Sequence, residues 1–210
     1  MTRGTVPSLH ALTTDVILAD PGFVASAHAL MHACDARVAI HLRATAVTAH
    51  RLLELALELR VVAERTGSWV LVHDRLDVAM VAGVTGAQLT SRSLSLADAR
   101  RIAPALALGA SVHESADAWV TAQSGATFLV AGHRDDGARM ATDQVTFVSE
   151  IVEAADGCPV IAVGGMTPER ASSIGRTGAA GIAAMRGIWF DDAPRAARRY
   201  LAAYDEGFRG

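Results

Sequence analysis

The 210-residue chain contains no lysine, and all 19 of its basic residues are arginines. Schiff-base catalysis depends on the neutral amine of a lysine, so the composition excludes a lysine-type aldolase. The 22 acidic residues give a formal net charge of −3. Nucleic-acid-binding surfaces normally carry an excess of basic residues, and we therefore expect no nucleic acid among the partners.

Long apolar runs and cysteines are scarce as well. No uninterrupted apolar stretch approaches the ~20 residues that cross a bilayer, and the N-terminus lacks the basic-then-apolar order of a signal peptide. We expect no membrane partner and, by default, a cytoplasmic location. The two cysteines, Cys34 and Cys158, share no motif, which favours free thiols over a disulfide or a metal pair.

Alanine and valine are abundant, and they lie in short apolar runs that alternate with segments of helical period. This alternation predicts one domain over residues 1–210, a (β/α)8 TIM barrel. An open doubly wound sheet is the alternative, although no G-x-G-x-x-G motif follows the first run. The eight predicted strands are Leu9–Thr14, Arg37–Arg43, Trp69–Arg75, Gly86–Ser91, Leu108–His113, Thr127–Gly132, Pro159–Gly164 and Gly181–Arg186.

Helix boundaries can also be predicted between these runs. Apolar residues three to five positions apart predict an amphipathic helix over residues 47–62, and Gly67 can end it. Thr167 is a candidate N-cap, and the proline after it fits the first turn of a helix. Asp192 marks the start of a further helix.

Polar residues gather at the predicted C-terminal ends of the strands, where the active sites of such barrels lie. Their convergence indicates a polar pocket. Three of the histidines, His41, His73 and His113, permit a metal-site interpretation, but no H-x-H or H-x-x-x-H spacing relates them to one another, and barrel-lining histidines in hydrogen bonds are the alternative. The candidates are His41, Arg43, His73, Gln88, Ser111, His113 and His133.

The last two strands end in glycine, which favours a phosphate site. Gly164, Gly165 and Met166 directly precede the predicted helix N-terminus, and Arg186 and Gly187 follow the eighth strand. Glycines let backbone N–H groups approach an anion, and the helix dipole favours negative charge there. Tight turns alone would also explain the glycines.

His133 follows an apolar strand and Gly132 directly. A histidine that titrates near neutral pH suits proton transfer at the mouth of a barrel. A solvated loop residue is an equal alternative from the residues alone.

Several stretches resemble the thiamin phosphate synthase/TenI superfamily, and together they cover nearly the whole chain. They are LHALTTD (9–15), AIHLRA (39–44), LVHDRLDVAMVAGVTGAQLTSRSLS (71–95), GASVHESADA (109–118), FLVAGH (128–133), PVIAVGGMTPERA (159–171) and GAAGIAAMRGIW (178–189). The resemblance implies one of two activities. Synthases join a pyrimidine pyrophosphate to a thiazole phosphate, and TenI-type tautomerases aromatise a carboxythiazole phosphate by moving a proton.

Departures from the synthase pattern separate the two branches. Thr45 stands where synthases carry a lysine, Ser93 where they carry a magnesium-binding aspartate, and GHRDDGARM (132–140) lacks a second lysine. A departing pyrophosphate needs cations to stabilise its charge. The resemblance therefore implies the tautomerase branch. Ala44 departs from that branch in turn, because an acidic residue follows the arginine there.

We accordingly expect an isomerase, a metal-independent thiazole tautomerase with no cofactor, whose small-molecule partner is a thiazole phosphate. His133 would transfer the proton and Arg43 would bind the substrate carboxylate. The alternatives are a thiamin phosphate synthase that uses arginines in place of lysines, and a non-catalytic barrel that binds a thiazole phosphate. The oligomeric state, including a homo-oligomer, stays open.

Overall fold

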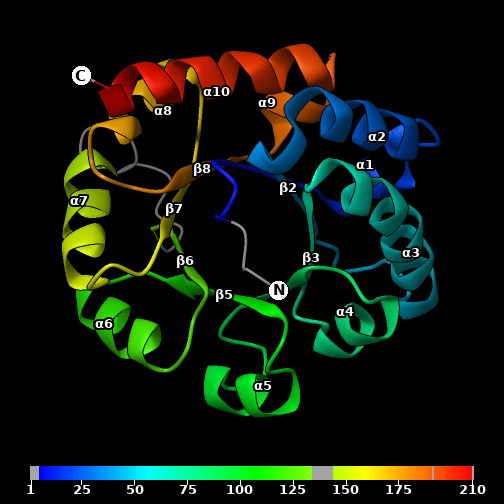
Figure 1. Ribbon diagram of the computed structural model, residues 1–210, viewed down its shortest axis with the longest axis horizontal. Coiled ribbons are helices and arrows are strands. Elements are labelled where there is room, and N and C mark those ends of the chain that lie inside the picture. Colours follow the sequence, from blue (N-terminus) through cyan, green and yellow to red (C-terminus); the bar gives the residue numbers. More distant parts are fainter. Residues whose placement is uncertain (1–4, 134–143, 191, 210) are drawn as a thin grey trace.

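Eight parallel strands close into a barrel in chain order in the computed structural model, which describes residues 5–133, 144–190 and 192–209. Each strand pairs with the next, and the last pairs with the first through Leu9 and Ile182. Figure 1 shows the strands as an inner ring. They are β1 (Leu9–Leu12), β2 (Val38–Leu42), β3 (Trp69–His73), β4 (Gly86–Leu89), β5 (Ala107–Val112), β6 (Phe128–Ala131), β7 (Val160–Val163) and β8 (Gly181–Ala184).

Helices form the outer ring, and α10 packs against α8 and α2 on one side of it (Figure 1). The helices are α1 (Asp15–Ala19), α2 (Phe23–Cys34), the 3-10 turn η1 (Asp35–Arg37), α3 (Ala49–Thr66), α4 (Leu76–Ala82), α5 (Leu96–Ile102), α6 (Ser115–Gln123), α7 (Gln144–Ala154), α8 (Pro168–Gly175), α9 (Arg186–Trp189) and α10 (Ala193–Arg209).

The helix α3 illustrates how the sequence defines an element. The side chain of Thr48 accepts a hydrogen bond from the backbone N–H of Arg51 and so caps the N-terminus. Leu55 and Leu59 are buried on the inner face. Gly67 adopts a left-handed conformation with φ 75°, which ends the helix.

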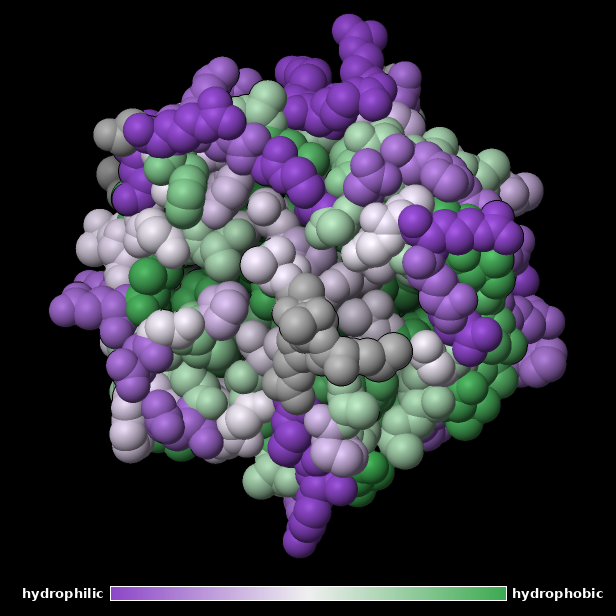
Figure 2. Space-filling view, in the orientation of Figure 1, coloured by the Kyte–Doolittle hydropathy of each residue, from purple (hydrophilic) through white to green (hydrophobic). Residues whose placement is uncertain are grey.

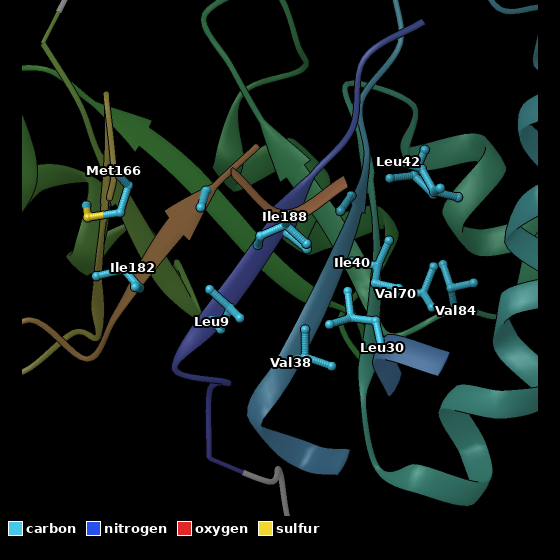
Figure 3. Close-up of a cluster of buried hydrophobic side chains, with 14 of the residues drawn as sticks. Leu9, Leu30, Val38, Ile40, Leu42, Val70, Val84, Met166, Ile182 and Ile188 are labelled. Atoms are coloured by element: carbon cyan, nitrogen blue, oxygen red, sulfur yellow. The ribbon is translucent and has the colours of Figure 1, made fainter. Parts of the chain in front are cut away.

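Two apolar clusters lie on opposite sides of the sheet. The larger one fills the space between strands and helices, where Val38 and Ile40 of β2 lie beside Leu30 of α2 (Figure 3). The smaller one lies inside the barrel and includes Phe128. Because neighbouring residues of a strand face opposite sides, every strand except β4 contributes to both clusters. The most hydrophilic residues lie around the edge of the face drawn in Figure 2.

The structure confirms the eight predicted strands and the closed barrel, and the open-sheet alternative is wrong. Several strands are shorter at their C-terminal ends than predicted because those residues begin the loops. Thr14 caps α1, Asp74 has φ 55°, and Gly164 has φ 123°. The predicted N-cap Thr167 is confirmed, and the short helix α1 was not predicted.

Both cysteines are free thiols, as expected. Burial raises the pKa of Cys158 to about 11, and the pKa of Cys34 is raised for the same reason. Within the described residues, no helix combines the length and the apolar character that a membrane span requires.

Candidate functional site

A two-part cavity opens at the C-terminal ends of the strands. Its wider part has a volume of about 570 Å³ and extends across the barrel mouth from β2 to β8. A narrower part of about 310 Å³ lies between the ends of β7 and β8 and shares lining residues with the first, among them Gly164, Gly165 and Arg186. The two parts therefore form one continuous cavity, and its two ends, the narrow one at β7 and β8 and the wide one that includes β2, are lined by different residues.

The narrow end is built on the β7–α8 turn, residues 164–167. Gly164 and Gly165 have φ angles of 123° and 49°, conformations that favour glycine. Gln144 of α7 donates to the carbonyl oxygen of Gly164 at 3.0 Å, and Tyr200 of α10 donates to that of Met166 at 2.9 Å. These two hydrogen bonds fix the orientation of the turn. The turn leads into α8, whose first N–H groups have no partners within the helix. An anion could bind there.

Arg43 lies at the other end, just beyond β2. The buried hydroxyl of Thr13 donates to the carbonyl of His41 at 3.0 Å and accepts from the backbone N–H of Arg43 at 2.9 Å. The following loop is held by Asp15, which accepts hydrogen bonds from the backbone of residues 45–47. These bonds lower the pKa of the Asp15 carboxyl. No hydrogen bond or ion pair occupies the Arg43 guanidinium within the described residues, so it can meet an anionic ligand.

Within the described residues, Asp74 is a carboxylate at which a magnesium ion could be considered, because its strand ends beside the cavity. Its Oδ1 accepts from the backbone N–H of Thr90 at 3.0 Å, from the Thr90 hydroxyl at 2.7 Å, and from the Ser93 hydroxyl. Burial raises the pKa of Asp74, but the bonds from Ser93 and Thr90 outweigh it, and the pKa lies below its ordinary value. The described residues include no group of three or more His, Cys, Asp or Glu that could hold a metal. Since Mg²⁺ needs free carboxylate oxygens, these residues do not fit a two-carboxylate magnesium site.

Two histidines line the middle of the cavity. His113 donates from Nδ1 to the carbonyl oxygen of Gly132 at 2.6 Å, because a carbonyl can only accept. His133 packs against Phe147 of α7 with ring centroids 4.0 Å apart. Its buried Nε2 has no hydrogen-bond partner among the described residues.

His41 and His73 belong to a hydrogen-bonded chain of three histidines. His41 lies between His73, at 2.8 Å, and His10 of β1, at 2.6 Å. His10 was absent from the predicted site, although its strand position gave a signal: it shares the inward-facing parity of Leu12, which lines the cavity. Gln144 was missed too, because nothing in its sequence context relates it to the β7–α8 turn.

The structure brings every predicted site residue to this cavity, and their roles stay predictions. The wide part is lined by His41, Arg43, His73, Gln88, Ser111, His113 and His133, and the narrow part by Gly164, Gly165, Met166, Arg186 and Gly187. The loop after His133, on which the absence of a lysine was judged, lies outside the described residues.

The fold and the site define a (β/α)8 barrel with a glycine turn between β7 and the N-terminus of α8. The comparisons with known proteins make the class specific. The family model described as thiamine monophosphate synthase (TMP-TENI) matches residues 17–188, and the chain belongs to this family.

Named relatives agree with that assignment. The thiamine-phosphate synthase of Methanoculleus marisnigri is 33% identical over 172 residues, which are 77% of this chain and 79% of that protein. The bifunctional protein ThiM/ThiE of Symbiobacterium thermophilum is 35% identical over 157 residues, 71% of this chain but only 32% of that protein. The solved structure of a thiamine phosphate pyrophosphorylase from Pyrococcus furiosus superimposes with a TM-score of 0.84 at 27% identity, covering 97% of this chain and 98% of the other.

These relatives correct the expectation of a thiazole tautomerase, which was wrong. Proteins that share about a third of their residues with this chain are named thiamine-phosphate synthases. The expectation gave too much weight to missing lysines. An arginine carries the same charge as a lysine and binds phosphate oxygens with two N–H groups at once.

Proposed function

We propose that the protein is a transferase of the thiamine-phosphate synthase type. It joins a pyrimidine pyrophosphate to a thiazole phosphate and releases pyrophosphate. The family assignment supports this proposal, and the observation that carries it is the two-part cavity, with Arg43 in the wide part and the β7–α8 turn and Arg186 in the narrow part. A tautomerase handles one small phosphorylated ring, whereas a condensing enzyme must hold two rings and two phosphorylated groups.

The thiazole phosphate is assigned to the narrow end. Its phosphate would accept hydrogen bonds from the β7–α8 turn and from the backbone around Gly187, with Arg186 supplying positive charge. Gly164 and Gly165 let the backbone approach closely because no Cβ intervenes. The pyrimidine pyrophosphate is assigned to the wide end, with its anionic group beside Arg43.

The chemistry requires one bond to break and one to form. The carbon–oxygen bond between the pyrimidine methylene and pyrophosphate breaks, and pyrophosphate leaves with the electron pair. The thiazole ring nitrogen donates its lone pair to the methylene carbon and becomes a thiazolium nitrogen. No proton is transferred, so no general base is needed. Arg43 stabilises the negative charge that develops on the leaving group.

His133 has a different task under this proposal. Its predicted role as a catalytic base depended on proton transfer, which the condensation does not include. The ring stacked on Phe147 forms a wall of the cavity. Such a wall can exclude water from the methylene carbon while the leaving group departs.

The test is pyrophosphate release by the purified protein with both substrates, with each alone, and with or without Mg²⁺. We expect release only with both substrates. Arg43→Gln should reduce kcat/KM by about 100-fold, the loss of one charge-assisted contact to a departing anion. Arg65→Gln, on the exposed side of α3, is the matched control and should retain the wild-type rate. Tight binding of both compounds without release would contradict the proposal and indicate a non-catalytic barrel.

A further inference from the structure

A chain of three histidines, two of them buried, crosses the barrel interior, and the condensation as proposed does not use it. The ring nitrogens of His10 and His41 are 2.6 Å apart, and those of His41 and His73 are 2.8 Å apart. The Nε2 atom of His10 lies 3.0 Å from the carbonyl oxygen of Pro7. His10 and His41 are fully buried, and Phe128 packs against both rings. The chain therefore runs from the backbone below β1 to the cavity.

The carbonyl of Pro7 determines the direction of every hydrogen bond in this chain. A carbonyl only accepts, so His10 must carry its proton on Nε2, and its Nδ1 is an acceptor. His41 then donates from Nε2 to His10, which leaves His41 Nδ1 as an acceptor. His73 donates from Nε2 to His41, and the Nδ1 of His73 carries a lone pair. Each neutral ring thus fixes the tautomer of the next.

Burial keeps the three rings neutral, as this pattern requires. It lowers the pKa of His10 and of His73 to about 3 each, and that of His41 well below its usual value. The charge of Arg43 lowers the pKa of His73 further. A protonated His73 would donate from both nitrogens, so Arg43 helps to preserve the acceptor.

The acceptor end of the chain meets the cavity. His73 is only partly buried and lines the cavity wall, and its Nδ1 has no hydrogen-bond partner among the described residues. Gln88 is its neighbour on β4, and its amide nitrogen donates to Ser111 and to the carbonyl of Leu89. The Gln88 Oε1 atom is left without a partner in the described part of the chain. That Oε1 atom is buried beside Gly109, so the acceptor that this wall offers to the cavity is Nδ1 of His73, and it should select a ligand that carries a donor.

We propose that His73 is a specificity-determining residue that accepts a hydrogen bond through Nδ1 from an amine N–H on the bound heteroaromatic ring, with His10 and His41 as positioning residues that fix its tautomer. The inference deepens the proposed function, and it rests on that function for assigning the ring to a pyrimidine. The hydrogen bond orients the ring, because only one edge of it carries the amine. It also favours an amine-bearing pyrimidine over one without the group.

Two substitutions of His73 separate its two nitrogens. In His73→Asn the side-chain oxygen lies near the place of Nδ1 and keeps the acceptor, whereas in His73→Gln the amide nitrogen lies near Nε2 and keeps the donor to His41. The probes are an aminopyrimidine pyrophosphate and the analogue with hydrogen in place of the amine. By calorimetry, the wild type should bind the amine compound roughly 10-fold or more tightly than the analogue. His73→Asn should keep this preference and His73→Gln should lose it.

A structural role alone would give a different result. If both variants kept the preference, or both lost it equally, His73 would not act through Nδ1. Nitrogen-15 NMR of histidine provides a second readout, and we expect protons on the Nε2 atoms of His10, His41 and His73. A proton on Nδ1 of His73 would overturn the inference.

Failure of the inference can be distinguished from failure of the proposed function. Amine preference without pyrophosphate release would support the role of His73 and contradict the condensation. Normal release with equal binding of the two probes by the wild type would support the condensation and contradict the role of His73.

Discussion

Acidification should destabilise the protein through the buried histidines. In the folded state burial lowers the pKa of His10 from 6.5 to about 3, so His10 stays neutral. In the unfolded state it regains its ordinary pKa and takes up a proton below about pH 6.5. The unfolded state therefore binds more protons as the pH falls from 7 towards 3, and the free energy of unfolding must fall with it.

The magnitude follows from the size of the shift. Below pH 6.5, protonation of His10 stabilises the unfolded state by about 1.4 kcal/mol for each pH unit. At pH 5, His10 alone therefore lowers the free energy of unfolding by about 2 kcal/mol relative to pH 7. His41 is equally inaccessible and its pKa is lowered for the same reason, so it acts in the same direction. A loss of this size is a large fraction of the ~5–15 kcal/mol typical of a domain.

The assay is urea unfolding at pH 7 and pH 5, followed by far-UV circular dichroism. His10→Gln removes one titrating group, and its amide N–H can still reach the carbonyl of Pro7. This variant should lose about 2 kcal/mol less than the wild type over the same interval. His32→Gln, an exposed position on α2, is the control and should keep the wild-type dependence. A wild-type loss below about 1 kcal/mol would refute the account of the buried chain.

Further predictions concern the two ends of the cavity. Ser93→Asp places a second carboxylate beside Asp74, so Mg²⁺ at ten times its Kd should stabilise this variant against thermal unfolding by about 1.4 kcal/mol and leave the wild type unchanged. Equal stabilisation of the two proteins would contradict the conclusion that the wild-type residues around Asp74 do not fit a magnesium site. Tyr200→Phe and Tyr204→Phe each remove a buried hydroxyl that donates to a carbonyl, at Met166 and Ala179 respectively. Both should cost about 1–2 kcal/mol, but only Tyr200→Phe should weaken the binding of a thiazole phosphate, because only Met166 lies in the β7–α8 turn. Gly187→Ala should also weaken that binding, since the added Cβ overlaps the Tyr200 side chain. Gly157→Ala meets open space; its φ of 81° makes the substitution cost stability, but it does not line the cavity and should leave the binding unchanged. Equal affinities in the two variants would place the phosphate elsewhere.

The barrel was predictable because each strand carries its own local signal. Apolar runs marked all eight strands, and Thr167 and Gly67 marked ends of α8 and α3 through capping preferences that act within a few residues. The predicted site residues also meet at one cavity, since parallel strands bring their C-terminal ends to the same side.

The histidine chain could not be predicted because it depends on the register between strands. His10, His41 and His73 are about 30 residues apart in sequence, and only the pairing of β1 with β2 and of β2 with β3 makes their rings neighbours. The function was mispredicted for a different reason. Single positions such as Thr45 and Ser93 were weighed against synthase activity, although similarity over most of the chain indicated it.

Pyrophosphate release tests the central claim most directly. The purified protein is mixed with the pyrimidine pyrophosphate and the thiazole phosphate, and pyrophosphate and the condensed product are quantified together. We predict equal amounts of the two, formed only when both substrates are present, and a large loss of rate in Arg43→Gln but not in Arg65→Gln. Binding of both substrates with neither pyrophosphate nor condensed product, in the presence or absence of Mg²⁺, would contradict the account.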